Sequence, residues 1–345
     1  MKLMKKDKSK RFLICRIDRI GDVVLSTPLP REIKRKYPDS FVAVLVRKYT
    51  KDIYLNNPNV DEIIIYNEEK TSKAFFENIK IIRSYKFDYA FMLLPDERLN
   101  YILFLSGIKT RIGVGHKLYQ FLTFTKYVDR KKYIPLRHEA DYCLDMLRKI
   151  GIEPVSIEPE IHLSEDEKKI AQSFKNSFAP NGEKLIGVNT TSGNSSPNLS
   201  IKEYRILIEK LSTVKDFKVI VTDLKPPNEI QNIPSVEYPM KKNSLRESIV
   251  KFSALDVLIS SSTGPMHICA ALKVPTISLF CPLPACSPKL WGPLGNRSLI
   301  LMPEEEYCQT KCPIDPKKCQ YEGSERINGE KIFEEVIKFF GMKTE

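Results

Sequence analysis

The sequence lacks any long hydrophobic run. Nowhere do about 18 apolar residues follow one another, which excludes a helix that crosses a membrane. The N-terminal stretch MKLMKKDKSK is basic, but the short β-rich segment RFLICRI follows it instead of an apolar region, so we expect no secretory signal. Zinc-finger spacing, a basic region with heptads and an aromatic RNA-binding signature are also missing, so we expect no nucleic-acid partner. Without a three-glycine dinucleotide fingerprint or a Walker sequence, the chain does not look like a dehydrogenase or a P-loop enzyme.

The charge of the chain is one-sided. Its 55 lysines and arginines outnumber its 43 aspartates and glutamates, which gives a net charge of +12. Such an excess favours polyanionic partners, which include nucleic acid, an anionic membrane surface and phosphorylated substrates. A proteome rich in lysine would produce the same surface, so the charge by itself does not choose among these explanations.

The cysteines give no sign of an oxidising compartment. Eight cysteines in 345 residues, without a secretory signal, indicate a reducing cytoplasm. Most of the scattered ones sit in apolar segments, where cysteine serves as a small hydrophobic residue. These are Cys15, Cys143, Cys269, Cys281 and Cys286. The others share one polar loop, where they could hold zinc with Cys286 as fourth ligand, form a disulfide or stay free thiols. They are Cys308, Cys312 and Cys319.

Short apolar strands alternate with longer amphipathic helices along the chain. This alternation indicates βαβ units and parallel sheets. The strands are expected at residues 11–17, 41–47, 60–66, 87–95, 110–115, 184–190, 217–223, 256–261 and 275–280. The helices are expected from about residue 22 to 39 and at 98–108, 137–152, 200–211, 244–255, 265–273 and 329–341.

The length of the chain, 345 residues, suits two domains. Residues 153–164 carry two prolines and no helical period, which is typical of a linker. We therefore predict two Rossmann-like α/β domains, residues 1–160 and 161–326, followed by a C-terminal helix within 327–345. Open α/β sheets bind ligands at the carboxyl ends of their strands, so the default site is a cleft between the two sheets.

The turn after the predicted strand 256–261 has the residues of an anion-binding site. It begins the segment SSSTGPMHICAAL, in which Gly264 permits a tight turn and Pro265 suits the start of a helix. The backbone N–H groups of Met266 and His267 would then face a ligand at the positive end of the helix. That geometry binds phosphate.

The side chains of this turn leave two explanations open. Ser262 provides a polar strand end, Thr263 can add a hydroxyl and His267 a ring N–H to the same anion. An ordinary capped turn fits these residues as well, with Ser262 or Thr263 as the N-cap and His267 as a surface residue.

A turn of similar plan follows the predicted strand 11–17. In RIDRIGDVVLSTP, Gly21 follows the strand and Asp22 opens a helix. Asp22 could be a simple N-cap. It could also act as a general base toward a substrate hydroxyl, because it is a carboxylate at a strand end that the positive helix end keeps ionised. Arg16 and Arg19 flank it and could bind phosphates or acidic sugars.

These segments together resemble the ADP-heptose:lipopolysaccharide heptosyltransferases, which are glycosyltransferase family nine. RIDRIGDVVLSTPLPREIKRKYPDSFVAVLVR is similar to the N-terminal signature of the family, and STGPMHICAALKVPTISLF is similar to its second signature. LFLSGIKTRIGVG and RHEADYCLDMLRKIGI fit family positions between them. The resemblance runs from about residue 11 to 325, and the two signatures in this order are more specific than either alone.

The resemblance implies a GT-B fold, in which the N-terminal domain binds the acceptor and the C-terminal domain binds the nucleotide-sugar. It implies inverting transfer of a heptose or related sugar, from a donor such as ADP-heptose to a lipopolysaccharide core acceptor, with no metal ion and no cofactor. By the same resemblance, Gly21 and Asp22 match the pair whose carboxylate activates the acceptor hydroxyl. Thr263, Gly264 and His267 match the turn that holds the donor diphosphate.

The donor side departs from the family pattern. Ser262 stands where many members have aspartate, and SPNLSIKEY stands where many have a basic residue, for which Lys202 could substitute. After VIVTD, the segment LKPPNEI replaces a loop whose acid contacts the nucleotide, and Glu229 is the acid carried over. A transferase with a different donor sugar and a non-catalytic sugar-nucleotide or glycan-binding relative are therefore alternatives.

The acceptor that the resemblance implies is an anionic, lipid-linked glycan at the inner face of the cytoplasmic membrane. We expect a cytoplasmic protein whose positive charge attracts it to that membrane surface without insertion, and peripheral attachment stays open. Residues 117–133, KLYQFLTFTKYVDRKKY, mix aromatic residues with lysine and could contact the surface. An ordinary helix and loop would explain the same residues.

Overall fold

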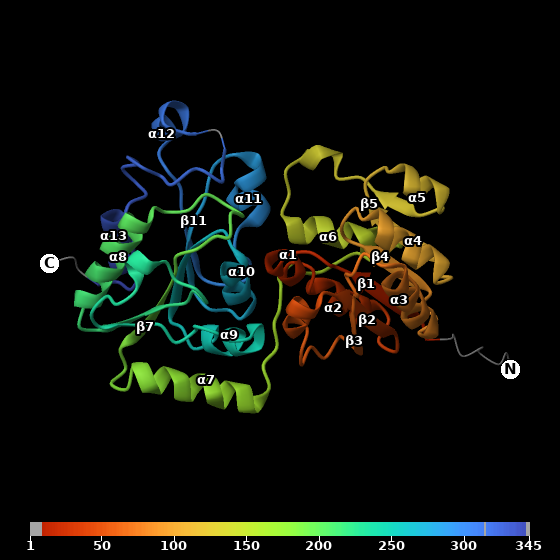
Figure 1. Ribbon diagram of the computed structural model, residues 1–345, viewed down its shortest axis with the longest axis horizontal. Helices are drawn as coiled ribbons and strands as arrows, with labels where there is room; N and C mark the ends of the chain where they lie inside the picture. Colours follow the sequence, from red (N-terminus) through yellow and green to blue (C-terminus); the bar gives the residue numbers. More distant parts are fainter. Residues whose placement is uncertain (1–8, 314, 343–345) are drawn as a thin grey trace. The chain divides into compact units, whose positions relative to one another are not determined.

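The computed structural model describes residues 9–313 and 315–342. The chain divides into two compact units, residues 1–161 and 162–345, and each contains one parallel β-sheet with helices around it (Figure 1). Residues 153–164, the predicted linker, carry no helix or strand.

The sheet of unit 1 has six parallel strands in the order β3-β2-β1-β4-β5-β6. The strands are β1 (Arg11–Cys15), β2 (Phe41–Val46), β3 (Glu62–Ile65), β4 (Tyr89–Met92), β5 (Thr110–Val114) and β6 (Lys126–Val128). β1 and β2 are buried on both faces, which explains why their sequences are continuous apolar runs rather than alternating patterns.

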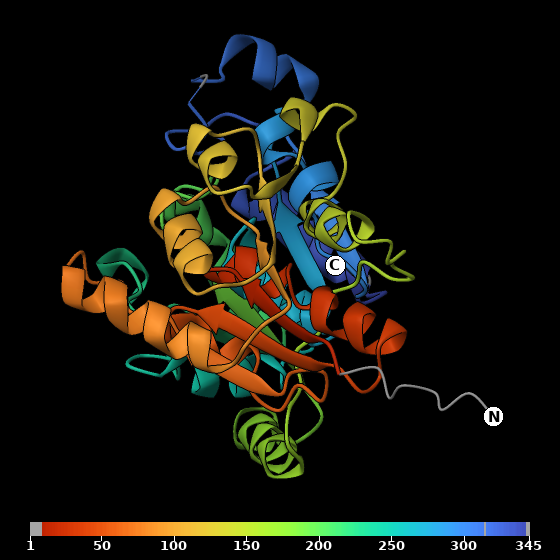
Figure 2. The same ribbon diagram turned by 90° about the vertical axis from the view of Figure 1, so that its right-hand side faces the viewer.

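The helices of unit 1 cover both faces of its sheet. They are α1 (Ile20–Val24), α2 (Pro28–Lys36), α3 (Ser72–Ser84), α4 (Glu97–Leu105), α5 (Leu118–Leu122) and α6 (Glu139–Arg148), with 3-10 turns η1 (Lys48–Ile53) and η2 (Lys131–Tyr133). On one face, Ile79 of α3 and Leu99 of α4 share a core with Leu13 of β1; the long helix α3 is orange in Figure 2. Phe12 points to the other face, where it stacks on Tyr37 at the end of α2.

The sheet of unit 2 repeats this plan, with six parallel strands in the order β12-β11-β10-β7-β8-β9. The strands are β7 (Lys184–Asn189), β8 (Phe217–Val221), β9 (Val236–Glu237), β10 (Val257–Ser261), β11 (Thr276–Leu279) and β12 (Ser298–Leu301). The helices are α7 (Glu165–Phe178), α8 (Ile201–Thr213), α9 (Leu245–Phe252), α10 (Gly264–Ala271), α11 (Pro288–Trp291), α12 (Glu305–Thr310) and α13 (Gly329–Phe339), with 3-10 turns η3 (Asn228–Ile230) and η4 (Pro284–Cys286).

The C-terminal helix α13 packs against α8 and belongs to unit 2. Gly329 makes this contact possible, because a Cβ at this position would lie 2.5 Å from the carbonyl oxygen of Glu203. Its N–H group donates to the carboxylate of Glu203 at 2.7 Å, which ties the start of α13 to α8.

Both sheets share a topology that determines where a ligand can bind. In each sheet the first strand of the unit lies beside the fourth, and the second and third extend from it in one direction while the fifth and sixth extend in the other. Such a sheet binds ligands at the carboxyl ends of the two strands where the order reverses. These pairs are β1 with β4 in unit 1 and β7 with β10 in unit 2.

The predicted α/β fold with two parallel sheets is confirmed. The helix expected from about residue 22 to 39 is wrong, because α1 and α2 are separate helices there. The sequence did not predict α3, α7, α11, α12, β6, β9 and β12. In α7 only Ala171 is fully buried, so the apolar stripe is too thin to show a helical period. The sequence does mark the start of this helix, by the capping box of Ser164 and Glu167. Among the described residues, no helix combines the length and the apolar character that spanning a bilayer requires.

Candidate active site

The carboxyl end of β1 leads directly to a buried arginine, Arg16. Its guanidinium donates to the carbonyl of Leu93, just beyond β4, with an Nη1–O distance of 2.8 Å. Arg16 therefore bridges the two central strands of unit 1 at the point where the sheet order reverses, which is where this type of sheet binds ligands.

Asp22 lies in the first turn of α1 and is held by this arginine. Its Oδ1 accepts a hydrogen bond from Nη2 of Arg16 at 2.7 Å, and its side chain is 21% exposed. One carboxylate oxygen is thus fixed by a charge-assisted bond while the side chain stays partly exposed, an arrangement that suits a general base. The N-cap alternative for Asp22 is wrong, because Arg19 occupies the N-cap position of α1.

A second, fully buried carboxylate holds Arg16 from α6. Glu139 places Oε1 3.3 Å from Nη2 of Arg16 and Oε2 2.7 Å from Nη1 of Arg130. Buried charges are tolerated when they are paired and hydrogen-bonded, and Glu139 serves both guanidiniums at once. These contacts lock the orientation of Arg16 and, through it, that of Asp22.

Asp18 completes the group, with its Oδ1 3.0 Å from Nε of Arg16. Burial raises the pKa of Asp18 to about 6; Arg16 opposes this shift, and the negative charge of Asp22 adds to it. We call this group the arginine cluster. It consists of Arg16, Asp18, Asp22, Arg130 and Glu139. Beside Asp22, the fully ionised cluster has two carboxylates and two guanidiniums, so the charges around Asp22 balance.

Replacing Asp18 by asparagine is expected to make the protein relatively more stable as the pH rises. The folded pKa of Asp18 is about 6, whereas the unfolded value is about 3.9, so the wild-type fold loses stability as the pH increases through this window. The asparagine variant has no group at this position that causes such a loss. The difference between its Tm and the wild-type Tm, measured by thermal unfolding, should therefore increase from about pH 4 to about pH 7. A Tm difference that stays constant with pH would show that Asp18 titrates normally.

The structure changes the role that Arg16 can play. Sequence analysis predicted that it binds the acceptor, yet its Nε, Nη1 and Nη2 atoms all contact groups inside unit 1. Binding an acceptor phosphate would break these contacts, so we assign Arg16 a positioning role toward Asp22. Arg19 is exposed at the N-cap of α1, and Gly21 lies inside α1 next to Asp22. Acceptor binding by these two residues stays a prediction.

The second predicted centre follows β10, where Thr263 is the N-cap residue of α10. Its side chain is 6% exposed, and among the described residues its Oγ1 has no hydrogen-bond partner. An N-cap hydroxyl normally accepts a bond from an N–H group of the first turn. Here it does not: Thr263 takes the N-cap position that the capped-turn alternative gave it, but its side chain makes no capping bond. A buried hydroxyl without a partner is costly, and a ligand that bonds to it would remove that cost.

The first turn of α10 presents backbone N–H groups next to this hydroxyl. Those of Gly264 and Met266 precede the first intrahelical bond and have no partner within the helix. The N–H of His267 donates to the carbonyl of Thr263 at 3.3 Å, so the prediction that it faces a ligand is wrong. The side chains of Met266 and His267 are both buried, which also excludes the surface role considered for His267.

Residues that sequence analysis did not single out complete this end of the second sheet. Asp223, two residues beyond β8, is buried and accepts five hydrogen bonds from Asn189, Thr190 and Thr191. Burial raises the pKa of Asp223, and these bonds offset only part of the shift. The carboxylate thereby ties the loop after β7 to the end of β8.

Asn198 links the same loop to β10. Its Oδ1 accepts from Ser261 at 2.7 Å and from Tyr204 at 2.8 Å, while its Nδ2 donates to the carbonyl of Thr190 at 2.8 Å. The loops after β7, β8 and β10 thus form one hydrogen-bonded rim, made by Asn189, Thr190, Thr191, Asn198, Asp223 and Ser261. The available signal was the polar run NTTSGNSSPN directly after a buried strand.

The other predicted donor-binding residues lie in different surroundings. Ser262 is half-buried between β10 and Thr263. Lys202 is exposed in the first turn of α8, and Glu229 is exposed in η3, where Arg205 donates to its backbone carbonyl. Neither Lys202 nor Glu229 belongs to the rim, and their contact with a donor stays a prediction.

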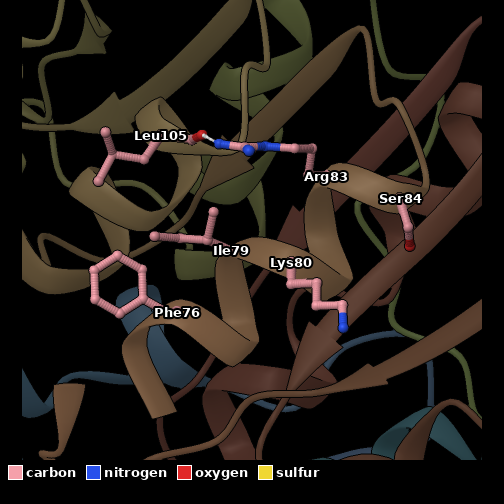
Figure 3. A pocket seen from close by; sticks show the side chains of 6 residues that line it. All are labelled: Phe76, Ile79, Lys80, Arg83, Ser84 and Leu105. Carbon is pink, nitrogen blue, oxygen red and sulfur yellow. Dashed lines mark hydrogen bonds between the residues drawn. The ribbon is translucent and has the colours of Figure 1, made fainter. Parts of the chain in front are cut away.

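A hollow of about 440 Å³ lies between α3 and α4 (Figure 3). It is lined by Phe76, Ile79, Lys80, Arg83, Ser84 and Leu105. The next residue after α3 is Tyr85, whose carbonyl accepts a bond from Arg11 at the start of β1. The hollow therefore lies toward the amino ends of the strands, at the opposite edge of the sheet from Asp22, and no carboxylate or histidine lines it.

The cysteines form no disulfide, and all eight are free thiols. The scattered ones are buried as predicted, except that Cys286 is half-buried. Within residues 9–313 and 315–342, no group of three or more His, Cys, Asp or Glu is placed to hold a metal ion, so the zinc alternative has no support. Cys319 is buried instead, with its Sγ 3.5 Å from the hydroxyl of Tyr307.

Comparison with known proteins identifies the family. The sequence profile of glycosyltransferase family 9 (heptosyltransferase) matches residues 77–319. Lipopolysaccharide heptosyltransferase 2 of Escherichia coli K12 is 21% identical over 305 residues, covering 82% of this chain and 85% of that protein. The crystal structure of the family 9 glycosyltransferase from Veillonella parvula has a TM-score of 0.78 at 22% identity, covering 95% of this chain and 96% of the other. E. coli heptosyltransferase WaaC with ADP has a TM-score of 0.70 at 13% identity, with 95% and 99% coverage.

These matches confirm the resemblance that the two signatures indicated and the GT-B fold that it implied. The profile covers well over half of the chain, and it includes the second signature with Thr263. The chain therefore belongs to glycosyltransferase family 9, the heptosyltransferase family, and is a glycosyltransferase.

Proposed function

We propose that the protein transfers a heptose or a related sugar from ADP-heptose to a lipopolysaccharide core acceptor, with inversion and without a metal ion. The single observation that carries this proposal is the partly exposed Asp22, held by Arg16 where the order of the first sheet reverses. Relatives named lipopolysaccharide heptosyltransferases support the acceptor class. Structural neighbours solved with ADP and with ADP-2-deoxy-2-fluoro heptose support the donor.

Unit 1 activates the acceptor in this proposal. The open edge of Asp22 takes the proton of the acceptor hydroxyl, whose oxygen attacks the anomeric carbon of the donor sugar. The bond from that carbon to the diphosphate oxygen breaks as the new bond forms on the opposite face, so the configuration inverts and ADP leaves. Arg16 keeps the carboxylate in place during this step.

Unit 2 holds the donor by its diphosphate. The N–H groups of Gly264 and Met266 and the hydroxyl of Thr263 are three donors at the positive end of α10. Negative charge grows on the diphosphate as the glycosidic bond breaks, and donors held in place beforehand stabilise that charge. The rim with Asp223 and Asn198 borders this site and keeps its loops in one conformation.

The proposal is tested by incubating the protein with ADP-heptose and lipopolysaccharide core acceptors that lack heptose, with and without EDTA. Release of ADP that depends on the acceptor and persists in EDTA would support it. Turnover only with another nucleotide-sugar would favour the alternative with a different donor. Binding of ADP without turnover on any acceptor would favour the non-catalytic alternative, which the positions of Lys202 and Glu229 outside the rim motivate.

Replacing Thr263 by valine is expected to weaken ADP binding by roughly 10- to 100-fold, because a hydrogen bond to a charged group contributes about 1.5–3 kcal/mol. The same change should not lower the Tm of the free protein, since the buried hydroxyl has no partner there within the described residues. Isothermal titration with ADP and thermal unfolding measure the two effects. Ser278→Ala on β11, which also removes a buried hydroxyl without a partner, is the matched control and should leave ADP affinity unchanged. Equal ADP affinity in Thr263→Val and wild type would contradict this donor site.

A further inference from the structure

A group of apolar side chains stands exposed on and after the short helix α5, which Figure 1 shows beside β5 in unit 1. Leu118 is 74% exposed, Phe121 78% and Phe124 84%, and Leu122 is exposed as well. We call these four residues the α5 patch. Single exposed apolar residues are normal, but several large ones on a short segment mark an interaction surface.

The backbone of the α5 patch is held firmly by buried polar contacts, so the exposure is a property of the fold. Thr123 and Thr125 are buried and both bond to the side chain of Asn100, at 2.8 and 2.9 Å. The buried guanidinium of Arg111 donates to the carbonyl of Thr123. Phe124, between the two threonines, has a φ of +53°, a conformation that costs free energy for a bulky residue and that the surrounding bonds must hold.

The segment that carries the α5 patch is mostly positive, while Asp96 and Glu97 at the start of α4 lie near Tyr119 of α5. Residues 117–133 contain five basic side chains and one acidic side chain, Asp129, which pairs with His116 at 3.4 Å. Lys117, Lys126 and Lys131 are exposed, whereas Arg130 is taken up by Glu139 in the arginine cluster. Exposed phenylalanine and leucine flanked by lysine are typical of a segment that lies in the interface of an anionic bilayer. Lysine is depleted in protein–protein interfaces, which makes a protein partner the weaker match.

We propose that the α5 patch docks unit 1 on an anionic lipid bilayer, with Phe121 and Phe124 entering the headgroup region and Lys117 and Lys126 contacting lipid phosphates. This goes beyond the proposed function, because the patch shares no residue with the arginine cluster or the α10 turn and would act whatever sugar is transferred. Its contribution would be to raise the concentration of the protein at the surface where a lipid-linked substrate resides.

Co-sedimentation of the full chain with vesicles tests this proposal. We expect the wild type to bind vesicles of phosphatidylcholine with about one-third phosphatidylglycerol and to bind phosphatidylcholine alone much more weakly, because each lysine near an anionic surface adds about fivefold. The double variant Phe121→Ser and Phe124→Ser should lose at least roughly tenfold in partitioning, since it removes the buried apolar area. Lys117→Gln with Lys126→Gln should weaken binding to anionic vesicles only. Val155→Ser, at a side chain that is 75% exposed elsewhere in unit 1, is the matched control and should bind like the wild type.

Further measurements distinguish a loss of membrane binding from damage to the fold or to the active site. Turnover on a soluble acceptor and the Tm should be unchanged in Phe121→Ser/Phe124→Ser, because both side chains already face solvent. Phe124→Trp should show a blue shift of the added tryptophan emission when anionic vesicles are mixed in. Wild-type protein that stays in the supernatant with both vesicle types would overturn the proposal, as would a double variant that binds like wild type. A dimer in sedimentation velocity that the double variant abolishes, without vesicle binding, would overturn it in favour of a second copy of the chain.

Discussion

Replacing Asp22 by asparagine is expected to lower kcat by about 10²- to 10⁴-fold, which is the usual contribution of a positioned general base. Asparagine has the same shape and can still accept a bond from Nη2 of Arg16 through its amide oxygen, so the arginine cluster should keep its geometry. The affinity for ADP should not change, because the proposed donor site lies in unit 2. Steady-state kinetics with ADP-heptose and titration with ADP separate these two effects.

Asp61→Asn is the matched control for this prediction. Asp61 is also a partly exposed carboxylate of unit 1 in an ion pair, with its Oδ2 2.8 Å from Nζ of Lys34, but it lies outside the arginine cluster. It should retain near-wild-type kcat. If Asp22→Asn kept more than about a tenth of wild-type kcat, a different group would have to be the base. Loss of ADP binding in Asp22→Asn would instead indicate a damaged fold.

Replacing Arg16 by methionine is expected to cost about 3–5 kcal/mol of folding free energy, because it leaves buried Glu139 without one of its two partners and removes the partner of Asp18 and Asp22. For a unit of this size, such a loss lowers Tm by roughly 10 °C. Because Arg16 also orients Asp22, kcat of the folded variant should fall as well. Arg16→Lys keeps the charge but lacks the planar guanidinium with its several donors. It should therefore recover part of the folding free energy but little of the kcat that depends on the orientation of Asp22.

Arg205→Met provides the comparison for the stability measurement. Arg205 pairs with Glu209 on α8 at 2.7 Å, and both side chains are nearly half exposed. Exposed pairs contribute about 0–1 kcal/mol, so this variant should unfold within a few degrees of the wild type. If Arg16→Met were as stable as Arg205→Met, the arginine cluster would not hold the carboxyl end of β1. If Arg16→Lys matched wild type in both Tm and kcat, the positioning role would be wrong.

Much of the fold and part of the site could be predicted because they depend on short-range patterns. The buried central strands are continuous apolar runs, and each is followed by polar or small residues where the chain leaves the sheet, as at Asp22 and Thr263. A family signature is a run of neighbouring residues, so the turns at Asp22 and Thr263 can both be recognised from the sequence. The elements that were missed are those with weak local patterns, such as α7, which buries only one residue fully.

The roles of individual side chains depended on contacts that no local pattern contains. Glu139 lies 123 residues from Arg16, and Asp223 lies 33 residues from Thr190. Parallel strands bring these groups together only after long crossovers, and pairing across such distances leaves no periodic signal in the sequence. The place of Arg16 beside Asp22 in the sequence therefore suits an acceptor ligand, whereas its contacts with Glu139 and Leu93 in the fold make it a positioning residue.

The sequence by itself determined the class of this protein: two α/β units, the family, and the two turns at which a base and a diphosphate site are proposed. These features follow from the hydrophobic periodicity of the strands and helices and from short runs of neighbouring residues. Both depend on local backbone preferences and on which side of an element is buried. The tertiary structure decided which charges are buried, which hydroxyls, such as that of Thr263, lack a partner among the described residues, and which phenylalanines remain in solvent. Burial and pairing are properties of the packed chain, because they depend on what distant segments place around a side chain rather than on the side chain itself.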